Sequence, residues 1–180
     1  MTQKKEKAII GSYLEPLLLA VEQHLNLSRE ALLEAAQIPP SLIQRSNRFI
    51  STTQYCNLLA TILQHTTSGE LINHLCQNLD ITQHGLLGLV TLCGINIRTS
   101  IKVLMRFYRM QAKIVKLDFT VKDDQAHIQI SSTATLHHAT DFTLQMGLIA
   151  ILKAKQQLIG LQQQADSLYL TASENDAMSL

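Results

Sequence analysis

The stretch IRTSIKVLMRFYRMQAKIVKLDFTVKDDQAHIQISS (97–132) decides the fold class, because the spacing of its apolar residues changes partway along. In its first part, apolar side chains recur every three or four residues, which predicts a helix from about Ile97 to Gln111. From residue 114 onward, apolar and polar side chains alternate, as in strands with one buried face. The polar run 122–125 lies between two such segments, so we predict a β-hairpin over residues 114–132.

A hairpin of this kind needs support, because two strands alone are only marginally stable in water. A short strand at Leu168–Leu170 or further chain beyond residue 180 would supply it, as would a packed helix. We expect such a helix to begin with Asp141 as its cap and to end at Gly160.

The chain before residue 97 is predicted to form helices separated by turns and caps. Residues 1–8 are polar and are expected to be frayed. Helices are predicted from Tyr13 to Leu25 and from the N-cap Ser28 to about Gln37. Further along we expect a helical turn at 41–45 and then a helix from a cap among 51–53 to about 67. A break at 68–69 is expected to separate this helix from the next one, through 71–79, and a segment of small residues follows at 82–94. The fold class is therefore α+β, mostly helical with a small antiparallel sheet packed on helices.

Composition excludes several classes of protein. Apolar residues make up 46% of the 180 residues and charged residues 16%, so a folded core is expected. The net charge of +1 gives no general attraction to nucleic acid or to an anionic membrane. The three cysteines form no CxxC pair and are interpreted as buried free thiols. Without a secretory signal or an apolar run of membrane-spanning length, a soluble cytoplasmic protein is predicted.

The block GLLGLVTLCGINIRTSIKVLMRFYRMQA (85–112) resembles the arabinose-binding type of sensor domain at the N-terminus of AraC-family transcription regulators. Gly85–Gly88 matches the small-residue start of the family pattern, and Ile101, Leu104 and Phe107–Arg109 match the helix before its hairpin. The stretches 27–43 and 50–66 also resemble this family, so the likeness covers about residues 12–170.

The resemblance implies that residues 1–180 form one effector-sensing domain, the N-terminal portion of a longer regulator. It implies a small-molecule effector, a homodimer, and contact with DNA only through a C-terminal helix-turn-helix domain that is absent from this chain. It does not make arabinose the effector. The alternative is a dimerisation or protein–protein module without a small-molecule ligand.

Basic residues form a series along the helix 97–111 and just beyond it: Arg98, Lys102, Arg106, Arg109 and Lys113. Arginines bind carboxylates and phosphates through paired hydrogen bonds, so Arg106, Tyr108 and Arg109 are candidate ligand-binding residues. The other interpretation of the series is a solvated helix face. We predict that Arg109→Ala weakens effector binding without unfolding the domain.

His137 and His138 are the other candidate ligand-binding residues, as a polar lining between the sheet and the last helix. An ordinary polar loop is the leading interpretation of the pair. No HxxxH or HExxH spacing occurs, so no metal site is predicted, and no cofactor is expected.

Neither DNA reading by this chain nor enzyme activity is favoured. Residues 28–45 have a helix-turn-helix rhythm, but the second helix offers only Arg45 and Arg48 and two prolines precede it, which favours a structural hairpin. The motifs GxSxG, GxxxxGK[ST] and GxGxxG are absent, so the chain is predicted not to be an enzyme.

Overall fold

The computed structural model describes residues 7–44, 48–78, 97–123 and 125–159. Residues 7–78 form a group of helices with a two-stranded sheet, which we call the helical block. Its elements are β1 (Lys7–Ile10), η1 (Gly11–Leu14), α1 (Glu15–Leu25), α2 (Arg29–Ala35), α3 (Pro40–Gln44), β2 (Phe49–Ser51), α4 (Thr52–Leu63) and α5 (Ser68–Asn78). Residues 97–159 form the hairpin block. Its elements are α7 (Ile97–Gln111), β3 (Val115–Lys122), β4 (Gln125–Ser132), η3 (His137–Ala139) and α8 (Thr140–Ile159).

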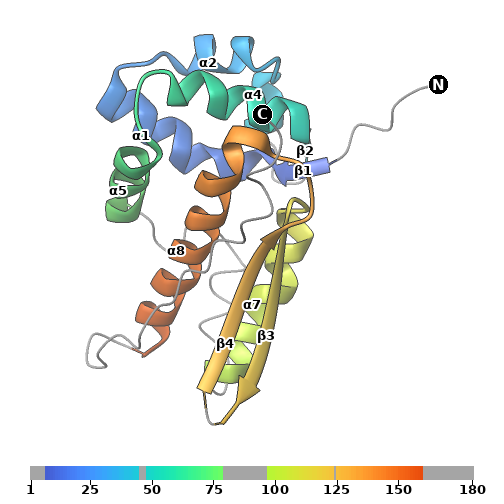
Figure 1. The fold of residues 1–180 in the computed structure, drawn as a ribbon. Coiled ribbons are helices and arrows are strands. Elements are labelled where there is room, and N and C mark those ends of the chain that lie inside the picture. The colour runs from blue at the N-terminus through green and yellow to red at the C-terminus, as the bar shows by residue number, and fades with distance from the viewer. Residues whose placement is uncertain (1–6, 45–47, 79–96, 124, 160–180) are drawn as a thin grey trace, which may run out of the picture.

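The two blocks meet at one end of the hairpin block. Figure 1 shows α1, α2 and α4 gathered at one end of the molecule, with α7, α8 and the β3–β4 hairpin extending away from them. The α+β class is confirmed, and a second antiparallel sheet, β1–β2, accompanies the predicted hairpin. Within the described ranges, no helix is both long enough and apolar enough to cross a bilayer.

Capping residues fix where the helices of the helical block begin. Ser28 caps α2 as predicted, because its hydroxyl accepts a hydrogen bond from the backbone N–H of Ala31. Of the three candidate caps before α4, Ser51 fills the position. Its hydroxyl accepts from the N–H of Gln54 (3.2 Å), and the Gln54 side chain accepts from the N–H of Ser51 (2.9 Å). This reciprocal capping box satisfies two backbone donors that the helix leaves open.

The expected break at Ser68–Gly69 is wrong, because both residues lie in the first turn of α5. The break falls earlier, since α4 ends at Leu63. Thr67 and Glu70 explain the shift. The Glu70 N–H donates to the Thr67 hydroxyl (3.3 Å) and the Thr67 N–H donates to the Glu70 carboxylate (3.1 Å). A T-x-x-E pair of this kind starts a helix even when serine and glycine fill its first turn.

Strand β1 corrects the expectation that residues 1–8 are frayed, at least for Lys7 and Ala8. The strand pairs antiparallel with β2, and Ala8 is fully buried. It also reaches the hairpin block: Ile9 forms a bridge with Ala112, and the N–H of Lys113 donates to the carbonyl of Ala8 (2.6 Å). The backbone of β1 therefore joins the two blocks. Residues 1–6 lie outside the described ranges.

The hairpin is confirmed, with Val115 opposite Ser132 and Lys122 opposite Gln125 across a two-residue turn. Asp123 in that turn has φ 50°, a left-handed conformation that aspartate tolerates. Helices α7 and α8 pack against the strands and supply the support that a lone hairpin lacks. The proposed third strand at 168–170 and the small-residue segment 82–94 lie outside the described residues.

Helix α7 has the predicted bounds, whereas α8 begins slightly earlier than expected. Asp141 lies within the first turn of α8 instead of capping it, because the 3-10 turn η3 leads directly into Thr140. Helix α8 passes close to β4 at Gly147. A Cβ built there would lie 2.4 Å from the Ile130 side chain, so only glycine fits without a shift. Cys56 is a buried free thiol as interpreted, Cys76 is free but only half-buried, and Cys93 lies outside the described residues.

Candidate functional site

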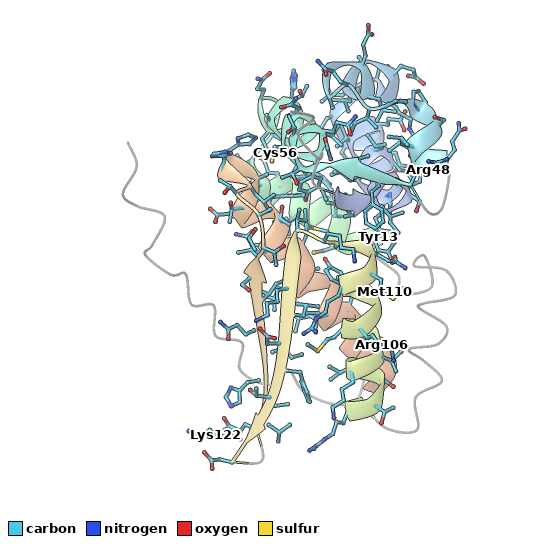
Figure 2. The ribbon with its side chains drawn as sticks, turned by 90° about the vertical axis from the view of Figure 1, so that its right-hand side faces the viewer. Tyr13, Arg48, Cys56, Arg106, Met110 and Lys122 are labelled. Carbon is cyan, nitrogen blue, oxygen red and sulfur yellow. The ribbon has the colours of Figure 1, made fainter. Side chains whose placement is uncertain are left out.

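A cavity of about 100 Å³ lies where the two blocks meet. Most of its lining is aliphatic and comes from both blocks. The helical block contributes Ile9, Leu14 and Leu17, and the hairpin block contributes Ile114, Val115 and Met146. Figure 2 shows Tyr13 at this junction, near the end of α7 that meets the helical block.

Three tyrosines bring polar groups to this apolar cavity. Tyr13 comes from η1, Tyr55 from α4 and Tyr108 from α7. The Tyr55 hydroxyl lies 2.9 Å from Oγ1 of Thr143 on α8, and that threonine donates its proton to the carbonyl of Ala139 (2.6 Å). Because a threonine hydroxyl has one proton to donate, Tyr55 is the donor to Thr143. The Tyr55 oxygen therefore keeps capacity to accept a hydrogen bond.

Burial makes all three tyrosines weak acids. It raises the pKa of Tyr108 to about 12 and is the largest cause of the raised pKa of Tyr13 and of Tyr55. The electrostatic influence of Tyr108 raises both of these pKa values further, whereas the hydrogen bond with Thr143 lowers the pKa of Tyr55. The tyrosines are thus uncharged near neutral pH. The described lining contains no aspartate, glutamate, lysine, arginine or histidine.

The predicted site residues divide between this cavity and the surface. Tyr108 lines the cavity. Arg106 and Arg109 do not, and both are exposed, with Arg106 lying on α7 away from the junction (Figure 2). The Arg109 guanidinium donates to the carbonyl of Leu117 and lies 3.5 Å from the carboxylate of Asp118, so it pairs with the hairpin.

His137 and His138 are exposed and do not line the cavity. The Nε2 atom of His138 lies 3.1 Å from the carbonyl oxygen of Cys56 on α4. The two histidines were expected to line a pocket between the sheet and the last helix. The cavity does contact the last helix, but among the described lining residues only Val115 comes from the β3–β4 hairpin, and the helical block supplies much of the wall. The roles of Arg106, Arg109, His137 and His138 in binding stay predictions.

The sequence contained one signal for Tyr13 and Tyr55, the two tyrosines that were missed. Tyr13, Tyr55 and Tyr108 are three of only four tyrosines in the chain, and each lies in an apolar helical stripe. A phenol in such a stripe needs a partner for its hydroxyl when it is buried. Nothing in the sequence indicated that the three rings converge, or that Thr143 joins them. Within the described ranges, no cluster of histidine, cysteine, aspartate or glutamate is suited to hold a metal ion.

Comparison with known proteins identifies one family over most of the chain. Residues 27–179 match the model of the arabinose-binding domain of AraC transcription regulators, N-terminal. The chain is also similar to the ornithine utilization regulator of Pseudomonas aeruginosa, with 27% identity over 141 residues. That match covers 78% of this chain but only 41% of the relative's length.

Proposed function

The chain belongs to the family of arabinose-binding domains at the N-terminus of AraC transcription regulators, and we propose that it is the effector-sensing part of such a regulator. A small molecule binds in the cavity between the helical and hairpin blocks, and its binding controls an attached DNA-binding domain. The observation that carries this proposal is the position of a partly open, mostly apolar cavity with three tyrosines between two blocks of the fold. Concave apolar sites with a few polar groups are the usual form of small-molecule sites.

The composition of the lining explains how binding would reach the rest of a regulator. The ligand would touch α1 and α4 on one side and α7 and α8 on the other. A ligand that prefers one arrangement of the two blocks shifts the population toward that arrangement. Any domain whose activity depends on the arrangement then responds to the ligand.

Several further features belong to the same proposal. The regulator acts in the bacterial cytoplasm, binds DNA through a helix-turn-helix domain, and forms a homodimer. This domain has no catalytic role and needs no cofactor. The sugar in the family's name is not carried over to this chain.

A dimerisation module without a ligand is the second candidate function. Helix α7 favours it, because Met110 is 55% exposed on a surface that also carries Arg106 (Figure 2). The two functions are compatible, since an effector can act by favouring one geometry of a dimer.

A thermal-shift screen of the 180-residue chain against sugars, amino acids, fatty acids, polyamines, nucleotides and small neutral compounds tests the sensing function. A ligand at about 100 times its dissociation constant adds roughly 2.7 kcal/mol to the free energy of unfolding, which raises Tm by about 5–10 °C. Ala150→Leu fills the cavity from α8 and should remove the shift. Gln145→Leu adds the same side chain at an exposed position of α8 outside the lining and should keep it.

The variant Arg109→Ala tests whether the effector binds in the cavity or on the basic surface of α7. If the effector binds in the cavity, the variant should bind with unchanged affinity in a calorimetric titration, because Arg109 contacts the hairpin instead. If the basic face of α7 binds it, affinity falls. A folded dimer that no compound stabilises would leave only the dimerisation function.

A further inference from the structure

We propose that the cavity selects one chemical class of effector: an uncharged hydroxyl compound about the size of a single six-membered ring, such as a phenol or a cyclic alcohol. This inference rests on the proposed function. It follows from the charge, the hydrogen-bonding groups and the volume of the cavity.

The lining disfavours a charged ligand of either sign. Its described residues include no acid or base apart from the three tyrosines, and these stay protonated far above neutral pH. The nearest candidate cation on α7, Arg109, is held by Leu117 and Asp118 of the hairpin. An ion placed in the cavity would lose its hydration without gaining a counter-charge, and that loss strongly opposes binding.

The polar groups of the cavity match a hydroxyl better than a carbonyl. Tyr55 donates its proton to Thr143, so its oxygen keeps acceptor capacity for a ligand. The Tyr108 hydroxyl has no hydrogen-bond partner within the part of the chain that the structure describes, so its proton is available. A ligand hydroxyl can donate a hydrogen bond to Tyr55 and accept one from Tyr108, whereas a ligand carbonyl can only accept.

Gly147 makes room for Tyr108 in this arrangement. A Cβ built on Gly147 would lie 3.4 Å from the Tyr108 hydroxyl and 2.4 Å from the Ile130 side chain. The glycine therefore leaves room for the Tyr108 hydroxyl beside α8.

The volume indicates how large the part of the ligand inside the cavity is. A protein cavity of roughly 150 Å³ holds one benzene molecule. The cavity here, at about 100 Å³, is smaller, but Met146 in its wall is a side chain that adapts its shape readily. One ring with a single hydroxyl fits this space after small adjustments, and a longer or branched molecule would extend out through its open side.

Four one-ring probes of similar size test the class: phenol, toluene, benzoate and benzylamine. We expect chemical-shift titrations of the 180-residue chain to show that phenol binds more tightly than toluene. Benzoate and benzylamine should bind more weakly than either. Tyr108→Phe should weaken phenol binding roughly 3- to 10-fold, the value of one hydrogen bond, and leave toluene binding unchanged.

The toluene titration also shows whether the variant still folds around an intact cavity. Ala150→Leu should remove the binding of both phenol and toluene, and Gln145→Leu should retain it. Equal binding of phenol and toluene, or equal phenol binding by wild type and Tyr108→Phe, would overturn the hydroxyl assignment.

Failure of this inference is distinguishable from failure of the proposed function. If benzoate or benzylamine binds more tightly than phenol, and Ala150→Leu removes this binding, the proposed ligand class is wrong but the cavity is still the effector site. Absence of binding by all four probes overturns the class as well. The sensing function itself fails only if no compound in the broad thermal-shift panel stabilises the chain in a way that Ala150→Leu removes.

Discussion

The helical block and the hairpin block bury their side chains in different ways. In the helical block, large side chains are fully buried along α1, α4 and α5, as at Leu18, Leu59 and Leu71. In the hairpin, burial is complete at Leu117, near the junction, and fades along the strands until Val121 is 42% exposed. One hydrophobic core therefore runs through both blocks, and it thins out along the hairpin toward the tip. The cavity lies where these two patterns of burial meet.

The largest expected effect is in the core of the helical block. Leu59→Ala should lower the free energy of unfolding by about 2–5 kcal/mol, because the fully buried side chain leaves a cavity behind. Ile128→Ala in β4, where the side chain is only half-buried, should cost about 1 kcal/mol. Urea unfolding followed by circular dichroism measures both. Equal losses would contradict the contrast between the blocks.

The tyrosines between the blocks should make stability depend on pH in alkaline solution. Tyr108 has a pKa of about 12 in the folded state and about 10 when unfolded, so below pH 10 its contribution is constant. Above pH 10 the unfolded chain releases this proton first, and stability falls until pH reaches about 12. Between pH 9 and 11 the wild type should lose about 1 kcal/mol more than Tyr108→Phe, measured by urea unfolding. A parallel decline of the two proteins would contradict the burial of this hydroxyl.

The capping box of α4 should contribute a smaller amount. Ser51→Ala removes the acceptor for the Gln54 N–H, so the free energy of unfolding should fall by about 1 kcal/mol. Thr53→Ala, at an exposed position two residues along the same helix, is the control and should change stability by less than about 0.5 kcal/mol. If the two variants lose the same amount in chemical unfolding, the cap does not stabilise the helical block.

The smallest effect is expected at the hairpin tip. Val121→Thr keeps a β-branched side chain and adds a hydroxyl at an exposed position, so its effect should stay within about 0.5 kcal/mol. Thermal unfolding of the variant should give a Tm within about 2 °C of the wild type. A larger decrease would mean that the tip is buried in solution, and the gradient along the hairpin would then be wrong.

Local signals were sufficient to predict most of the elements. The period of apolar residues defined α7 and the hairpin, and Ser28 marked the start of α2. Strand β1 was missed because four residues are too few to show an alternation, and its pairing partners lie in β2 and at Ala112. The start of α5 was misplaced because Ser68–Gly69 suggested a break and the Thr67–Glu70 cap was overlooked.

The cavity was harder to predict because it depends on contacts between distant segments. Tyr55 and Thr143 are 88 residues apart in sequence. Tyr108 was identified, but the reason given was its neighbour Arg109, whose side chain pairs with the hairpin. Charged residues attract attention in a sequence, whereas the polar groups of this cavity are neutral hydroxyls within apolar stripes.

The bridge from β1 to residues 112–113 has a consequence for how the chain folds during synthesis. Strand β1 can pair with β2 as soon as residue 51 has emerged from the ribosome, but Ile9 must wait for Ala112. At a synthesis rate of about 5–20 residues per second, this delay lasts several seconds. During that time the buried edge of β1 lacks its second partner, and contacts of such long range form slowly. The first strand to be made is therefore among the last to be completed.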